Sequence, residues 1–252
     1  SMYTWHKLIH DLAERHRVIA VDIPGCGYSS KAEDFAYEVD GIAELLVRFM
    51  DTIALKETDA LAFSSGAIYL LRAVQLHPRR FNRLALIAPG GLTQDMPFFV
   101  RALVNPVLSW LYRLMISPDS IRKLLSDCFF DQTQVTDEMV RENYAPLEDS
   151  QARKVLCTML RALDEGETMQ GLREVDKEVL LLWAMEDQWH DELMAQSFEA
   201  SLPHNKLVTV RNCGHILQEE KPERCLAELE DFYEYGLAGP PPVRDDSPFI
   251  II

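Results

Sequence analysis

The chain has 252 residues, a formal net charge of −15, and hydrophobic residues at 48% of its positions. This length can bury a large core, so we expect one domain with an inserted subdomain rather than two independent domains. The negative charge argues against nucleic acid and anionic membranes as partners, because both are bound through clustered Lys and Arg. The most apolar stretch, residues 96–116, contains Arg101, Pro106 and Arg113, so we expect no membrane span.

The cysteines show neither a paired framework nor the spacing of a zinc site. They are Cys26, Cys128, Cys157, Cys213 and Cys225. We therefore expect a reducing compartment and a cytoplasmic location. The sequence contains no phosphate-binding loop and no dinucleotide fingerprint, so we expect no cofactor and no metal.

The first 53 residues predict a helix, a strand, a turn and a second helix. Apolar residues at helical spacing predict a helix from Trp5 to Leu12. The apolar run at residues 17–21 is typical of a strand buried on both faces of a parallel sheet. A Gly/Pro turn covers residues 22–29, and the spacing over residues 42–53 predicts an amphipathic helix.

Residues 60–91 predict a strand, a helix and another strand. A strand at 60–63 runs into a helix at 67–76, and a strand at 84–88 follows. Such alternation predicts an α/β fold, with a mostly parallel sheet flanked by helices.

Ser64 lies between the first strand and the helix of this unit, as in a nucleophile elbow. There the serine adopts a strained backbone, and the residues two before and two after it, here Ala62 and Gly66, are small. The helix N-terminus would place positive potential and the free N–H of Ser65 beneath the hydroxyl, as an oxyanion donor.

The alternation of predicted strands and helices stops between residues 92 and 176, where no strand-like run occurs. Helix starts recur at Ser117 and Thr136, each a capping residue followed by acidic positions. Strand-like runs resume at 179–183 and 207–210, before a last amphipathic helix. We therefore expect a core made of residues 1–91 and 177–252 and a helical cap at residues 92–176.

Two further residues complete a possible triad with Ser64. Asp187 follows the strand at 179–183, and His215 follows the strand at 207–210. Serine, acid, histidine is the chain order of the α/β-hydrolase triad. Glu186 and Asp191 lie close enough in sequence to compete for the acid position.

Three motifs together resemble the α/β-hydrolase superfamily over about residues 3–235. They are Asp22-x-Pro24-Gly25-x-Gly27-x-Ser29, Trp183-Ala184-x-x-Asp187, and Cys213-Gly214-His215 followed by Glu220 and Pro222. The resemblance implies a serine hydrolase with Ser64 as nucleophile, Asp187 as acid and His215 as base. It also implies that the inserted helices form a cap that shapes the substrate pocket.

The implied reaction is cleavage of an ester, thioester or lactone of an apolar small molecule through an acyl-enzyme on Ser64. The residues that could line the pocket, with His190 as a polar donor, are Phe63, Phe98, Phe99, Trp110, Tyr112, Met115 and His190. Two simpler roles stay open: the apolar residues could pack the cap on the sheet, and His190 could be a surface residue.

The chain lacks the H-G loop that supplies the second oxyanion donor in the superfamily. Residues 2–4 could replace this donor. Otherwise the protein could be a non-hydrolytic relative, such as a cyclase, lyase or ligand-binding protein, with His215 as base.

The strand that normally carries the H-G loop also has no counterpart before Trp5. We expect the apolar run at residues 248–252 to fill this central position, in a circularly permuted connectivity. The Pro-rich linker before it could span about 30 Å, at about 3.1 Å per residue. Two other roles stay open: a tail outside the sheet, or a strand donated to a neighbouring molecule, so we expect a monomer or a homodimer.

Overall fold

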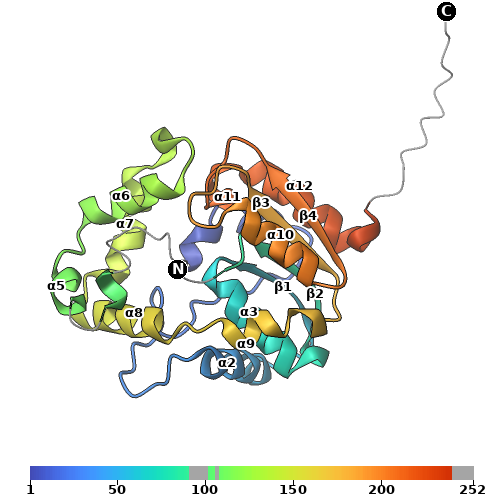
Figure 1. The fold of residues 1–252 in the computed structure, drawn as a ribbon, viewed down its shortest axis with the longest axis horizontal. Helices are drawn as coiled ribbons and strands as arrows, with labels where there is room; N and C mark the ends of the chain where they lie inside the picture. The colour runs from blue at the N-terminus through green and yellow to red at the C-terminus, as the bar shows by residue number, and fades with distance from the viewer. Residues whose placement is uncertain (91–101, 106–107, 240–252) are drawn as a thin grey trace, which may run out of the picture.

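The computed structural model of the protein describes residues 1–90, 102–105 and 108–239 (Figure 1). Its sheet has four parallel strands in the order β1-β2-β3-β4. They are β1 (Thr58–Phe63), β2 (Phe81–Ile87), β3 (Val179–Ala184) and β4 (Asn205–Val210). The predicted α/β class and the four strands at these places are confirmed.

Helices cover both faces of the sheet, because alternate residues of each strand point to opposite sides. Leu84 and Leu86 of β2 pack in a cluster with α2 (Val39–Thr52), α3 (Ser65–Leu76) and α10 (Glu192–Ser201). Ala85 and Ile87 pack on the other face with α1 (Ile9–Ala13) and α12 (Pro222–Tyr235). Short turns of helix, η1 (Met2–Trp5) and α11 (Leu217–Glu220), lie near the triad loops.

The described part of the inserted segment consists of helices joined by short loops, and it contains no strand. Its helices are α5 (Ser109–Leu114), α6 (Pro118–Cys128), α7 (Asp137–Tyr144), α8 (Ser150–Ala162) and α9 (Gly166–Gln170). Ser117 and Thr136 cap α6 and α7 through their side chains, as their sequence predicts. Helices α5 to α8 form a separate group beside the sheet (Figure 1).

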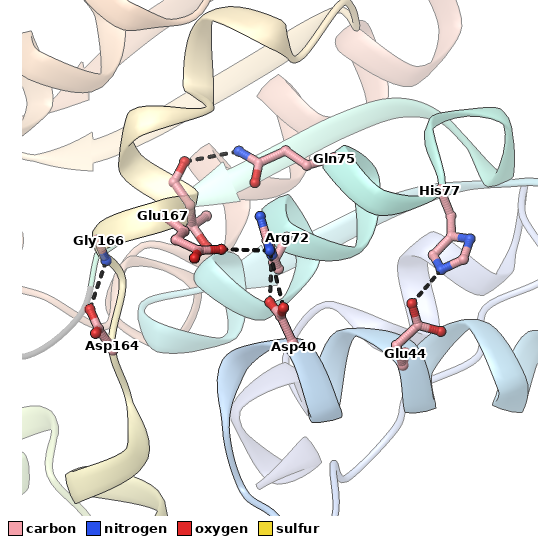
Figure 2. A network of polar contacts seen from close by, with 9 residues as sticks. Asp40, Glu44, Arg72, Gln75, His77, Asp164, Gly166 and Glu167 are labelled. Carbon is pink, nitrogen blue, oxygen red and sulfur yellow. Dashed lines mark hydrogen bonds and ion pairs between the residues drawn. The ribbon is translucent and has the colours of Figure 1, made fainter.

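Arg72 of α3 connects the end of the inserted segment to the core. Its guanidinium donates hydrogen bonds to Asp40 of α2 at 2.5 Å and to Glu167 of α9 at 2.7 Å (Figure 2). The hydrogen bond from Arg72 also lowers the pKa of the Asp40 carboxyl. Nearby, Gln75 donates to the carbonyl of Thr168 at 2.9 Å (Figure 2). Side chains of α3 therefore form hydrogen bonds with both α2 and α9.

The predicted strand at residues 17–21 is wrong, because this segment has no strand structure. The side chains of Val18, Ile19 and Val21 are each more than a third exposed. Within the described residues β1 pairs only with β2, and segment 17–21 pairs with none of the four strands. The apolar run at 248–252, which we expect beside β1, lies outside the described residues.

Among the residues that the structure describes, no helix combines the length and the apolar character that a bilayer crossing needs.

Candidate active site

Ser64 occupies a strained turn between β1 and α3. Its φ of 51° lies in a region that L-residues rarely adopt, as expected for a nucleophile elbow. The amide of Ser64 still donates to the carbonyl of Ile87 at 3.0 Å, so the turn follows directly from the ladder with β2. A Cβ added at Gly66 would meet no described atom within 4 Å, so crowding by these residues does not explain this glycine.

The structure brings Ser64, Asp187 and His215 together. His215 Nδ1 lies 2.8 Å from Asp187 Oδ2, and His215 Nε2 lies 3.1 Å from Ser64 Oγ. Since a carboxylate only accepts, Nδ1 carries the proton and Nε2 is free to accept the hydroxyl proton. This is the relay that a serine nucleophile requires.

The carboxyl of Asp187 is buried but fully bonded. Its Oδ1 accepts hydrogen bonds from the amides of Trp189 at 2.8 Å and His190 at 3.0 Å. Burial alone would raise the pKa of Asp187, but the hydrogen bond and charge of His215, with these two amides, hold it below the usual value. The side chain is therefore an anion at neutral pH and orients the imidazole.

The two competing acids have other partners. Asp191 accepts from the amide of Met194 and caps α10. Glu186 accepts from the amide of Cys213 at 3.2 Å and thereby links the loop after β3 to the loop that carries His215. Of the three acids, Asp187 is the one with a described hydrogen bond to His215, and the resemblance to the superfamily also favours it.

Aromatic rings surround the imidazole of His215. The Trp189 ring stacks on it at 5.7 Å between centroids and 15° between planes, and the Phe63 ring lies at 4.8 Å. Trp189 is not among the residues predicted from the sequence, although its place two residues after Asp187 is a signal for it.

His190 lies behind the triad rather than at its surface. The side chain is 0% exposed, and its Nδ1 lies 2.9 Å from the carbonyl oxygen of Ala88. Its ring meets that of His215 edge-on at 4.8 Å. A side chain so buried is better placed to support His215 than to donate to a substrate.

The other residues expected in the pocket are placed only in part. Phe98 and Phe99 lie outside the described residues, and the side chain of Tyr112 is not described. Trp110 and Met115 are 59% and 54% exposed. Among the candidates whose side chains the structure describes, Phe63 and His190 have rings in contact with that of His215.

The amide of Ser65 is the expected oxyanion donor. The amide of Ser65 belongs to the first residue of α3, where helical amides lack an intrahelical partner. Within residues 2–4, the Met2 amide donates to Asp22 at 2.6 Å and the Thr4 amide to Ser1 at 3.2 Å. These two amides are therefore engaged elsewhere.

The triad also brings metal-ligand atom types together, because atoms of Asp187, His190 and His215 lie within 4.8 Å of one another. The Asp187–His215 hydrogen bond and the His190–Ala88 contact already use three of the polar atoms of this group. These contacts are the described roles of the three atoms. A surface cavity of about 210 Å³, lined by Lys7, Asp11 and Pro222 among others, contains none of these residues.

Comparisons with known proteins show that the chain is similar to hydrolases. The sequence pattern described as "Alpha/beta hydrolase family" matches residues 1–228. An uncharacterized hydrolase, YugF of Bacillus subtilis, is 24% identical over 92% of this chain and 85% of its own length. A 2-hydroxymuconate semialdehyde hydrolase of Pseudomonas sp. strain CF600 is 25% identical over 90% of this chain and 80% of its own.

Solved structures share the fold. The meta-cleavage product hydrolase of Pseudomonas fluorescens IP01 superposes with a TM-score of 0.79 at 20% identity, covering 92% of this chain and 85% of its own. The 2-hydroxy-6-oxo-6-phenylhexa-2,4-dienoate hydrolase of Rhodococcus sp. strain RHA1 gives 0.79 at 21% identity, with the same coverage.

Proposed function

Because this chain belongs to the alpha/beta hydrolase family, we propose that it is a serine hydrolase that cleaves an ester, thioester or lactone of an apolar small molecule. The observation that carries this proposal is the contact of 3.1 Å between Ser64 Oγ and His215 Nε2, on an imidazole already held by Asp187.

The proposed reaction follows from these positions. The Ser64 oxygen attacks the substrate carbonyl carbon while His215 takes the hydroxyl proton, and the amide of Ser65 donates to the oxygen that becomes negative. His215 then gives its proton to the leaving alcohol or thiol. Water, activated by the same imidazole, cleaves the acyl-enzyme and restores the serine.

The bond that is cleaved could instead be a carbon–carbon bond next to a ketone. Two relatives carry the names of hydrolases of 2-hydroxymuconate semialdehyde and of a 2-hydroxy-6-oxo-dienoate, and these favour this second candidate. The two candidate reactions need the same base and different leaving groups.

The free state of the five cysteines supports a reducing location such as the cytoplasm.

The test is covalent labelling with a fluorophosphonate. The serine oxygen attacks phosphorus, fluoride leaves, and the hydroxyl proton passes to His215. We expect the native chain to be labelled at Ser64 and the Ser64→Ala variant to remain unlabelled. Absence of labelling in folded native protein at neutral pH would reject the proposal.

A substrate panel separates the candidates. We expect turnover of acyl esters and thioesters to disappear in both Ser64→Ala and His215→Ala. Turnover of an oxo-dienoate without turnover of esters would favour the second candidate. Turnover that survives Ser64→Ala and fails only in His215→Ala would favour the non-hydrolytic cyclase or lyase.

A further inference from the structure

One buried carboxylate joins the cap to the loop that carries His215. Glu220 is 4% exposed, and its Oε2 accepts from the amide of Gly214 at 2.7 Å and from the amide of Phe130 at 3.1 Å. Its Oε1 accepts from the amide of Asp131 at 2.7 Å. Gly214 directly precedes His215, and Phe130 and Asp131 follow helix α6 of the cap.

The two backbones are in close contact at this point. A Cβ added at Gly214 would lie 2.3 Å from the carbonyl oxygen of Cys128 and 2.8 Å from the amide nitrogen of Phe130. Real Cβ atoms do not approach other atoms so closely. Only glycine therefore allows the histidine loop to lie against the end of α6.

The residue on the other side of His215 also packs against the cap. Ile216 is 7% exposed and packs in the apolar cluster of the cap with Leu125, Phe129 and Met139. The imidazole is thus flanked in sequence by one residue bonded to Glu220 and one residue buried in the cap core.

The described hydrogen-bond partners of Glu220 are these three amides and the thiol of Cys213, the residue before Gly214. Buried amides need acceptors, and a carboxylate binds them more strongly than a neutral group does. The carboxylate therefore connects two segments that are 84 residues apart, Asp131 and His215, without touching the reacting atoms.

We propose that Glu220 is a positioning residue that couples the placement of the cap to the alignment of His215 with Ser64. The coupling means that a displacement of the α6 end moves Gly214, and through it the imidazole. This inference rests on the proposed serine hydrolase function, since it assigns the alignment of that reaction's base.

The variant Glu220→Gln tests the coupling, because it keeps the shape and replaces one acceptor oxygen by a donor NH₂ that faces backbone N–H groups. The readout is the second-order rate of Ser64 labelling by a small ethyl fluorophosphonate, which needs little of the cap pocket. We expect a fall of about tenfold or more, as for a loss of one charge-assisted hydrogen bond. The matched control is Glu219→Gln, a neighbouring buried acid that bonds Thr4 instead, and we expect it to stay within about threefold of the native rate.

A second readout does not depend on activity. We expect amide hydrogen exchange to become faster together in peptides covering residues 128–134 and 211–216 of Glu220→Gln, and not in Glu219→Gln. The variant Gly214→Ala disrupts the same contact from the other side. It should reproduce both effects, and it replaces Glu220→Gln if that variant does not fold.

The outcomes separate the two proposals. If the native chain is not labelled, the proposed function fails and the inference fails with it. If the native chain is labelled and folded Glu220→Gln and Gly214→Ala react at the native rate, the positioning role alone is overturned. Equal losses in Glu220→Gln and Glu219→Gln would also overturn it, because the effect would then be general damage to the segment.

Discussion

The hydroxyl of Thr4 donates a hydrogen bond to the carboxyl of Glu219 over 2.9 Å, and thereby joins the first helical turn of the chain to the segment after His215. Burial raises the pKa of Glu219 to about 7, against the opposing effects of Thr4, Lys7 and the amino terminus. The unfolded chain titrates this group near 4.5. Between these pH values the folded protein holds a proton that the unfolded chain has lost, so stability falls as the pH rises through this window.

We predict that Glu219→Gln removes this loss. The variant should be more stable than the native chain by roughly 2–3 kcal/mol at pH 8, and the difference should vanish near pH 4, where both states of Glu219 are protonated. Urea unfolding at the two pH values measures it. The exposed Glu223→Gln is the control, and an equal gain at both pH values would contradict the prediction.

Asp187→Asn should lower kcat by about 10³–10⁴ while leaving the fold intact, because an amide favours the wrong imidazole tautomer and cannot stabilise the imidazolium. Steady-state kinetics on an ester substrate measure this loss. Asp191→Asn is the matched control, since asparagine also caps helices well. A comparable kcat loss in both variants would show that the acid has been assigned to the wrong residue.

Trp189→Leu should lower kcat by about 2- to 30-fold, because the indole face that stacks on His215 stabilises the imidazolium through a cation–π contact worth about 0.5–2 kcal/mol. The main-chain bond from residue 189 to Asp187 stays in the variant. Trp189→Phe keeps a ring and should retain most of the activity. Identical rates in the Leu and Phe variants would exclude this role for the ring.

Residues 248–252 remain our predicted partner of the β1 edge. The Ser64 amide points to β2, so the backbone groups of Leu61 and Phe63 point to the other side. Ile251→Asp should therefore lower the urea midpoint and speed amide exchange at Leu61 and Phe63, and Val243→Asp in the linker should not.

Two results would count against this pairing. If exchange at Leu61 and Phe63 is the same in native and Ile251→Asp chains, these residues do not cover β1. If the native chain is a dimer, and dilution removes the protection of the Leu61 and Phe63 amides from exchange, residues 248–252 are donated to a neighbouring molecule.

Much of the fold follows from local patterns. The elbow at Ser64 could be predicted because a strand, a serine and a helix in immediate succession leave few other backbone paths. Ser117 and Thr136 start helices for an equally local reason, since each side chain bonds an amide three residues ahead. The run at residues 17–21 shows the limit of this reasoning. Its composition is that of a buried strand, but a strand also needs a partner that pairs with it, and composition does not show whether one lies beside it.

Local patterns in the chain were enough to predict the alternation of strands and helices, the elbow, and the order in which Ser64, Asp187 and His215 occur. These features depend on periodicity and turn chemistry, which act over a few residues. Three contacts could be found only in the folded chain: Glu186 accepts from Cys213, Trp189 stacks on the imidazole, and Glu220 joins the segment after α6 to the loop that carries His215. Each of these contacts depends on how loops from different strands meet in space, and local sequence does not encode that meeting.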